Sequence, residues 1–439
     1  MLIRKAKGQA IGPRLAGLCA LLLIGTVALS ACNDQPSSPP ATARPTLTAN
    51  QQSGCETDPT PTKTLYIGAG SFANDPKTIT LSAVDQTTGT QQWSQVIAHT
   101  TVANFQSLQV ANGILYVTYP LINSDQPVPT AISALDAKDG HQIWQYKAEP
   151  QTQIDNLQVC DGIILLYLSD TTTNTQSIQA RRTSDASLIW NYHPNGYVSR
   201  PVITKDSIYT VTATIPDLQK CGTQSTKNTC NTFSTIHALQ RNDGKERWHS
   251  NQYTTSFGSV TITATQQAVY AIYPTASAQS LQNQQNIEIS NAVDALSVQE
   301  GTQIWHAQTR INNVISQSIV NAGILYVGGK GVEALQASTG SSLWTNPDME
   351  AQNLQITSQG IYSAEPGTQK FCNLDLQNGK NQWCATAPDS GTITATSSDT
   401  IYTGANFAGT IYALQKTDGR ERWHYQTETD HRIFALALA

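Results

Sequence analysis

The sequence has few charged residues and lacks the motifs that usually carry chemistry. Only 13% of its 439 residues are charged, and the formal net charge is −5. This acidic balance, without a basic run after the first residues, predicts no nucleic-acid partner. The chain contains no Cys-x-x-Cys, His-x-x-x-His or Gly-x-Ser-x-Gly motif and no phosphate-binding glycine loop. We therefore expect no metal, no cofactor and no catalytic residue.

Long apolar runs are also absent, except near the start of the chain. Residues 1–31 combine four basic residues in the first 14 positions with the apolar run Leu15–Leu29, which is short for a membrane span. The run leads into Leu-Ser-Ala-Cys, ending at Cys32. This resembles a bacterial lipobox, whose cysteine is lipidated and becomes the mature N-terminus. We expect a lipoprotein signal peptide over 1–31 and lipidation of Cys32; an uncleaved anchor or an ordinary signal peptide is the alternative.

The next stretch, residues 32–63, is rich in proline, serine and threonine and has no apolar periodicity. Such a composition predicts a disordered tether. Residues 64–439 follow as one domain without a break in composition. The order of segments predicts an exported protein, lipid-anchored to a bacterial membrane. The protein would then lie on the outer surface of the cell membrane, or in the periplasm or at the outer membrane if the bacterium has two membranes.

All eight tryptophans occur in one repeated phrase, of which ALQKTDGRERW, ending at Trp423, is an example. In seven copies a glycine in a polar turn stands four residues before the tryptophan, and in the copy that ends at Trp190 the place holds Ala186. We expect the rings to wedge between neighbouring repeat units, that of Trp190 less tightly. The repeat tryptophans are Trp93, Trp144, Trp190, Trp248, Trp305, Trp344, Trp383 and Trp423.

A second phrase, an apolar residue followed by tyrosine, lies between the tryptophans, as at Leu115-Tyr116 and Leu166-Tyr167. With the turns around it, this phrase divides each unit into four short strands, called A to D here, of which D carries the tryptophan. The tryptophans are 39 to 58 residues apart, and such units are typical of β-propeller blades. The sequence predicts an all-β, eight-bladed propeller of four-stranded antiparallel blades; an open β-array or two smaller domains is the alternative.

The two ends of the repeat region complement each other. The first unit starts at strand B, near Leu65, and has no strand A, whereas the chain ends in the alternating apolar stretch Ile433–Ala439. We expect this stretch to be strand A of blade one and to pair with Leu65–Ala69, which closes the ring. Alternation predicts two sides of the strand: Phe434, Leu436 and Leu438 on one, and Ile433, Ala435 and Ala437 on the other.

The repeat resembles the quinoprotein-type (PQQ-like) β-propeller repeat, whose docking phrase reads Ala-Leu-Asp-x-x-x-Gly-x-x-x-Trp. The lipobox with eight such units is similar to the propeller lipoprotein of the outer-membrane β-barrel assembly machine, which implies a non-catalytic protein- or peptide-binding scaffold in envelope protein assembly. The quinone-dependent alcohol dehydrogenases of the same family resemble one another in an adjacent Cys-Cys pair, which this sequence lacks. We expect no enzyme; a dehydrogenase-like enzyme or a ligand- or sugar-binding sensor is the alternative.

Six cysteines remain once the signal peptide and the lipidated residue are set aside. An even number in an exported chain favours disulfides. One pair flanks a C–D hairpin, and another closes a nine-residue step inside one loop. The spacing predicts the bonds Cys372–Cys384 and Cys221–Cys230 and leaves Cys55 with Cys160.

The B–C connections differ in length around the predicted ring. Those of blades one to five are long and share one face and one arc, whereas those of blades six to eight are short. Because loops on a rigid scaffold usually carry binding, we expect other envelope or extracellular proteins or peptides to bind this face of a monomer; neutral insertion is the alternative. The long connections are Ser71–Thr78, Pro120–Thr130, Ser169–Gln176, Ala213–Phe233 and Pro274–Asn286.

Overall fold

The structure, a computed structural model, describes the greater part of the repeat region. The described residues are 63–71, 77–100, 107–121, 130–214, 231–255, 258–276, 289–311, 315, 317–350, 354–365, 370–386, 393–405, 409–428 and 430–438. All of them belong to one compact unit, Pro45–Ala439. They contain no helix of the length and apolarity that a membrane crossing requires. The predicted signal peptide, Cys32 and the predicted tether up to residue 62 lie outside these ranges.

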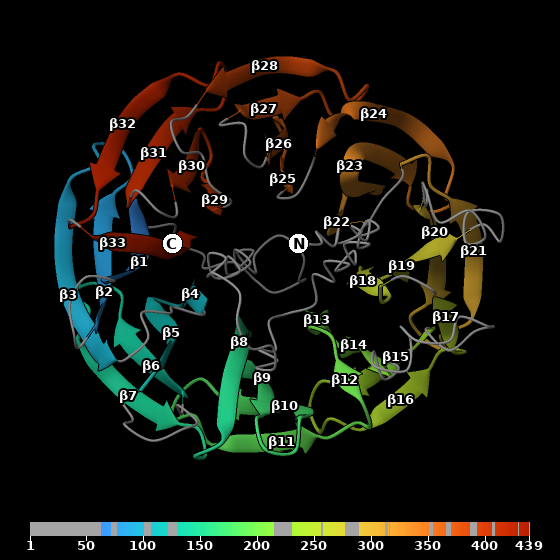
Figure 1. Ribbon diagram of the computed structural model, residues 1–439, viewed down its shortest axis with the longest axis horizontal. Helices are drawn as coiled ribbons and strands as arrows, with labels where there is room; N and C mark the ends of the chain where they lie inside the picture. Colours follow the sequence, from blue (N-terminus) through green and yellow to red (C-terminus); the bar gives the residue numbers. More distant parts are fainter. Residues whose placement is uncertain are drawn as a thin grey trace, which may run out of the picture. The chain divides into compact units, whose positions relative to one another are not determined.

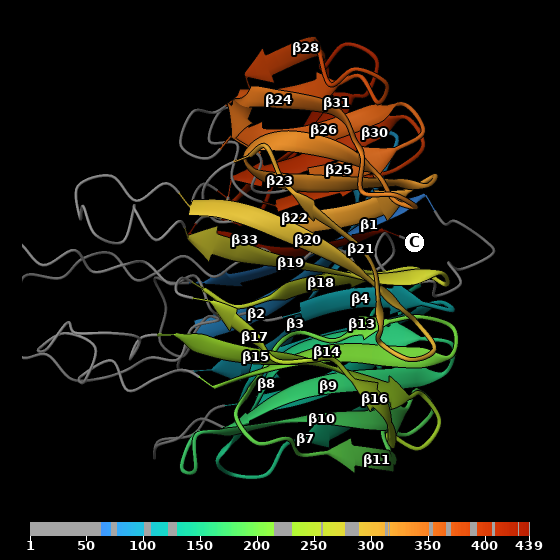
Figure 2. The same ribbon diagram turned by 90° about the vertical axis from the view of Figure 1, so that its right-hand side faces the viewer.

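Eight antiparallel sheets stand side by side around a ring, as the sequence predicts (Figure 1). Strand A of each blade is innermost and strand D outermost, and the strands run between the two faces of the ring (Figure 2). In A-to-D order, blades one to three are β33 (His431–Leu438), β1 (Thr64–Ser71), β2 (Lys77–Asp85), β3 (Gln91–Thr100); β4 (Ser107–Ala111), β5 (Ile114–Pro120), β6 (Thr130–Asp136), β7 (Gln142–Lys147); β8 (Thr152–Cys160), β9 (Ile163–Asp170), β10 (Thr175–Arg182), β11 (Leu188–Tyr192).

Two later blades depart from the plain four-strand pattern. In blade four the short β12 and β13 both pair with β14, and β15 pairs with both β16 and β17. In blade six the first part of β23 pairs with β22 and its last part with β24, so β23 covers strands B and C. Blades four to six are β12 (Tyr197–Val198), β13 (Val202–Ile203), β14 (Ser207–Thr214), β15 (Thr232–Gln240), β16 (Glu246–His249), β17 (Tyr253–Thr255); β18 (Thr261–Ala264), β19 (Ala268–Ala276), β20 (Ile289–Ser297), β21 (Gln303–Gln308); β22 (Gln317–Asn321), β23 (Ile324–Gln336), β24 (Ser342–Glu350).

Burial follows the position of a strand in its blade. Every residue of β1 is buried because sheet neighbours and adjacent blades cover it, whereas exposure alternates along the outer strand β7.

Blades seven and eight follow the A-to-D order of the first three blades: β25 (Leu354–Thr357), β26 (Gly360–Glu365), β27 (Lys370–Leu374), β28 (Asn381–Thr386); β29 (Ile393–Thr396), β30 (Thr400–Ala405), β31 (Thr410–Gln415), β32 (Glu421–Gln426).

The C-terminal strand closes the ring as predicted. β33 pairs with β1 from Leu65↔Leu438 to Ser71↔His431 (Figure 1). The expected alternation of its side chains is wrong at one step, because the register shifts between Gly68 and Ala69. This bulge places Ile433 in the cluster that contains Leu436 and the blade-eight core, and Phe434 in the blade-two cluster.

Each described repeat glycine lies under the tryptophan of the preceding blade. A Cβ added at Gly379 would lie 2.3 Å from the Trp344 ring, and one added at Gly140 would lie 2.9 Å from the Trp93 ring. Glycine is therefore required at this position for two reasons: the backbone has a positive φ, and the tryptophan ring leaves no room for a Cβ. The pairs are Gly89–Trp423, Gly140–Trp93, Gly244–Trp190, Gly301–Trp248, Gly340–Trp305, Gly379–Trp344 and Gly419–Trp383.

Seven tryptophans also donate their indole N–H to a carbonyl in the next blade, over 2.9 to 3.1 Å. The exception is the half-buried Trp93, whose Nε1 atom is buried and has no partner among the described residues; the Ala137 carbonyl instead accepts from Tyr66 Oη at 3.0 Å. The expectation that Trp190 is loosely seated is wrong. Its ring lies on Gly244 and is 7% exposed, because a blade's tryptophan depends on the turn of the following blade.

Seven of the eight repeat tyrosines pack against the tryptophan of their own blade, with ring centroids 5.7 to 6.1 Å apart. Blade three differs from the sequence interpretation. Leu165, not Tyr167, pairs with the alanine opposite Trp190, as Tyr116 does in blade two. Tyr167 lies two residues further on and donates to the Val198 carbonyl of blade four at 2.7 Å.

Candidate binding surfaces

The structure describes only some of the cysteines that the sequence analysis singled out. Cys372 and Cys384 are directly opposite in β27 and β28 and form the predicted disulfide, with a Cα–Cα distance of 4.1 Å. Cys160 is disulfide-bonded. Its predicted partner Cys55, like Cys32, lies outside the described residues, so this pairing stays a prediction. The predicted Cys221–Cys230 bond lies outside them as well.

The face with the B–C connections is described at blade three. The expected long loop Ser169–Gln176 is wrong, because β9 continues to Asp170 and β10 begins at Thr175. Asp170 closes this four-residue turn by accepting from the backbone N–H groups of Thr172 and Thr173, at 2.8 and 2.9 Å. The other four predicted long connections contain residues outside the described ranges.

Beside this turn lies a carboxyl with an altered pKa. A bulge in β8 at Asp155 turns its side chain toward β9, where Ser169 Oγ donates to Asp155 Oδ2. Burial raises the pKa of Asp155 to about 6, and burial together with the nearby carboxylate raises the pKa of Tyr167. The face where binding is expected therefore carries a carboxyl whose pKa burial raises to about 6.

The opposite face, formed by the A–B and C–D turns, holds a cleft of about 840 Å³ across blades three to five. Its walls come from turns that are far apart in the sequence, and apolar lining is limited to Ile163, Val298 and the buried Tyr209. Sequence reasoning missed this cleft. The sequence feature nearest to a signal is the cationic pair in ALQRNDGKERW of blade four, Arg241 and Arg247, but it does not identify the cleft because a similar pair recurs in ALQKTDGRERW of blade eight.

The two arginines of the cleft differ in their partners. Arg241 donates to Asp161 Oδ2 at 2.8 Å and to the carbonyl of Cys160 at 2.7 Å, so its charge is neutralised within the wall. Arg247 donates to Ser207 Oγ at 2.6 Å and makes no ion pair with a described residue. Its remaining N–H groups are available to a ligand.

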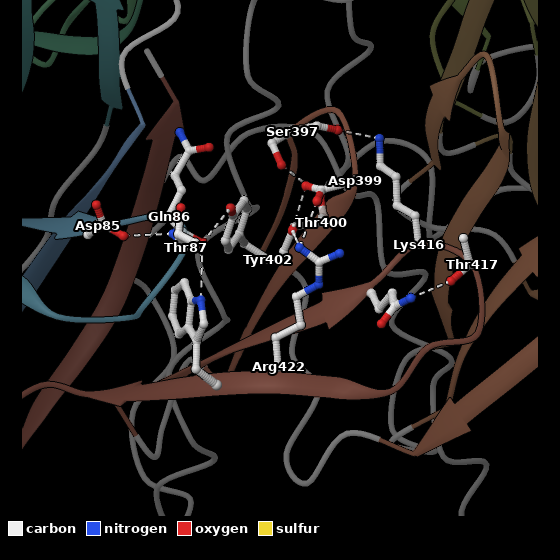
Figure 3. A network of polar contacts seen from close by, with 12 residues as sticks. Asp85, Gln86, Thr87, Ser397, Asp399, Thr400, Tyr402, Lys416, Thr417 and Arg422 are labelled. Atoms are coloured by element: carbon white, nitrogen blue, oxygen red, sulfur yellow. Dashed lines mark hydrogen bonds and ion pairs between the residues drawn. The ribbon is translucent and has the colours of Figure 1, made fainter.

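The equivalent turns of blade eight form a closed polar network at the junction with blade one (Figure 3). Arg422 donates to Asp399 Oδ2 at 2.7 Å, and Thr400 Oγ1 donates to the same carboxylate at 2.9 Å. Lys416 is 3% exposed and donates to the Ser397 carbonyl. Burial lowers the pKa of Lys416 to about 8. The Arg422 guanidinium is thus already paired with a carboxylate, whereas that of Arg247 makes no ion pair with a described residue.

The remaining polar groups that could suggest a reaction are tied to local structure. The histidines that follow a repeat tryptophan each lie beside a carboxylate of the same blade: His249 by Glu246, His306 by Asp294 and His424 by Glu421, at 2.7 to 2.8 Å. The described residues whose ligand atoms come close enough to hold a metal ion are Asp136, Asp139 and His141, which line one exposed turn. Both aspartates accept backbone N–H groups of that turn, as hairpin residues do.

Comparison with protein families gives one match over most of the chain. The family model described as outer membrane protein assembly factor BamB matches residues 40–250 and 289–437. No curated protein sequence matches the chain.

Several solved structures have a similar fold. BamB from Moraxella catarrhalis is 14% identical with a TM-score of 0.46, and the alignment covers 73% of this chain and 87% of that one. AztD from Citrobacter koseri is 10% identical with a TM-score of 0.52, over 86% and 98% of the two chains. The dihydro-heme d1 dehydrogenase NirN is 9% identical with a TM-score of 0.55, over 91% and 82%. For AztD and NirN the similarity shows the fold alone.

Proposed function

Since the chain belongs to the outer membrane protein assembly factor BamB family, we propose that it is a non-catalytic scaffold that binds other envelope proteins or peptides, with a role in envelope protein assembly. The family match over residues 40–250 and 289–437 carries this proposal. The sequence supports the non-catalytic part, since the motifs of the common hydrolytic, metal and phosphate sites are missing from it.

The propeller suits a scaffold for a physical reason. Tryptophan–glycine contacts and indole hydrogen bonds join neighbouring blades, and β33 ties the last part of the chain to the first. Such a ring holds the ends of its strands in fixed relative positions, so a partner can bind at several blades without ordering the body. We place the main partner surface on the B–C face, at the long connections of blades one, two, four and five, and we propose that the protein acts as a monomer.

The anchor is part of the same proposal. We propose that Cys32 is lipidated and holds the propeller at the outer surface of a bacterial membrane. Cys32→Ala should abolish lipid labelling and leave the protein uncleaved or released from the membrane. Labelling of the variant equal to that of the parent would remove the lipobox from the proposal.

The partner surface can be tested with the anchored protein in intact cells. Photo-crosslinking groups placed in the Pro120–Thr130 and Ala213–Phe233 connections should capture envelope proteins. The same group at Arg420, an exposed residue of the blade-eight C–D turn on the opposite face and away from blades three to five, serves as a control and should capture far less. Equal capture from both faces would contradict the assignment of the surface, and quinone-dependent oxidation of an alcohol by the purified body would contradict a non-catalytic role.

A further inference from the structure

The cleft on the turn face has the chemistry of a second binding site. We infer that it binds a carboxylate of an extended polypeptide segment, with Arg247 as the anchoring cation. This inference rests on the proposed scaffold function and extends it to the face opposite the long connections.

The first argument is a comparison within the ring. Arg247 and Arg422 occupy the same position in blades four and eight, one residue before the repeat tryptophan. Arg422 is paired with Asp399, which Thr400 Oγ1 also holds (Figure 3). In blade four Ser207 stands in the place of Thr400 and accepts from Arg247 at 2.6 Å, as Thr400 Oγ1 accepts from Arg422 at 3.0 Å. Among the residues described, Asp206, the equivalent of Asp399, makes no ion pair, so the guanidinium keeps the donors that a carboxylate accepts in bidentate geometry.

The second argument concerns the rest of the lining. Gln240, Asn242 and Gln266 line the cleft, and within the described part of the chain their side-chain amides make no hydrogen bond. Primary amides offer both donors and acceptors, which match the N–H and C=O groups of a peptide backbone. Most residues that line the cleft are polar or charged, and such a lining does not suit a compact apolar ligand, whose pockets are mainly hydrophobic.

Charge decides how many anionic groups the cleft accepts. Asp161 neutralises Arg241, and the other charged residues of the lining are Lys205, Arg247 and Asp206. This balance accommodates a single carboxylate and disfavours a polyanion such as a nucleic acid, because the lining carboxylates repel further negative charge. The carboxylate can come from an acidic side chain or from the end of a polypeptide.

The test uses the mature protein and three fluorescent peptides of one neutral, polar sequence. The first carries a central Glu and blocked ends, the second carries only a free C-terminal carboxylate, and the third has Gln in place of Glu and blocked ends. Binding is followed by polarisation at low and high salt. We expect one or both carboxylate peptides to bind more tightly than the third peptide and to weaken with salt. The preferred peptide identifies the source of the carboxylate.

Arg247→Gln is the decisive variant, because glutamine can still donate to Ser207 while the charge is lost. It should weaken binding about tenfold or more, the effect of losing a charged hydrogen-bond donor. The matched control Arg422→Gln in blade eight should bind like the parent. The inference is overturned if no carboxylate peptide binds at about 1 mM, if the Gln peptide binds equally well, or if Arg247→Gln leaves affinity unchanged. Envelope crosslinking at the B–C face is measured separately, in the parent and in Arg247→Gln. Absence of crosslinking in the parent would remove the scaffold function, whereas loss of peptide binding alone removes only this site.

Discussion

The indole nitrogen of Trp423, in the last blade, donates to the carbonyl oxygen of Gln86, in the first C–D turn of the chain, at 3.1 Å. The same pair of blades is also joined where Gly89 lies under the Trp423 ring. The ring is thus closed twice, by a side-chain contact at the outer strands and by the backbone ladder between β33 and β1 at the centre. If one closure is lost, the other still joins the ends of the ring, but the protein should be less stable.

Trp344→Ala should show how much one ring contributes. The side chain is 9% exposed and packs with the blade-seven residues Leu354 and Ile361. We expect a loss of about 3–5 kcal/mol in the free energy of unfolding, measured with urea. The neighbouring Leu343 is 48% exposed, and Leu343→Ala should change the free energy by no more than about 0.5 kcal/mol. Equal midpoints for the two variants would show that the indole is not part of the core.

Gly379→Ala separates steric contact from backbone strain. Gly379 has φ +69° and no room for a Cβ below Trp344, whereas Gly113 has φ +72° and nothing within 4 Å of an added Cβ. Gly113→Ala should therefore cost only the left-handed conformation, about 1 kcal/mol. Gly379→Ala should cost about 1–3 kcal/mol more, from overpacking. Thermal unfolding of both variants checks this, and equal losses would contradict the docking role of the glycine.

Truncation after His431 tests the central closure. It removes most of β33 and leaves the inner edge of β1 unpaired, so the truncated protein should aggregate or melt well below the parent. Phe434→Ala keeps the backbone ladder and serves as a control, which should stay monomeric in light scattering. A truncated protein that remains monomeric with an unchanged melting temperature would require another mode of closure.

Lys416 should give stability an unusual pH dependence. Burial lowers its pKa from 10.5 to about 8, so between these values the unfolded chain holds a proton that the folded chain has released. Unfolding then takes up a proton, and the free energy of unfolding rises with pH across this window, on the order of 2–3 kcal/mol in all. Lys416→Met should lack this rise, while the exposed control Lys245→Met should keep it. Parallel pH curves for the parent and Lys416→Met would contradict the buried-lysine assignment.

The disulfides are tested by mass spectrometry of a non-reduced digest. We expect Cys372–Cys384, Cys221–Cys230 and Cys55–Cys160; free thiols at Cys221 and Cys230 would contradict the second pair. Replacing both Cys372 and Cys384 by serine should cost free energy at the low end of about 0–5 kcal/mol, because a separation of 12 residues constrains the unfolded chain little. A large drop in melting temperature would point to a wider role for this bond.

The blade count and the closing strand could be predicted because both depend on residues with few structural substitutes. A repeated glycine in a tight turn, with a tryptophan at a fixed distance after it, is visible in the sequence. So is the missing strand A of the first unit. The errors arise where one residue shifts the register. The bulge at Phe434 moved Ile433 to the other side of β33, and in blade three Leu165 took the place that pattern reading gave to Tyr167.

The cleft could not be predicted for a different reason. Its lining comes from the turns of three blades, and the turns after Cys160, Ile203 and Ala264 carry no shared motif. The availability of Arg247 depends on whether Asp206 folds back toward it, which the nearly identical phrases of blades four and eight do not reveal. Only three-dimensional contacts distinguish the paired arginine from the unpaired one.

Because Leu438 pairs with Leu65, the two ends of the propeller lie where any other blade has its A–B hairpin. The architecture of the ring therefore does not determine at which strand the propeller segment begins. A short turn that joins residue 438 to residue 63 would make blade one like its neighbours, and the chain could be opened instead after blade two, between Lys147 and Thr152. Such a circular permutant should fold to the same ring, with every blade then built from one continuous segment.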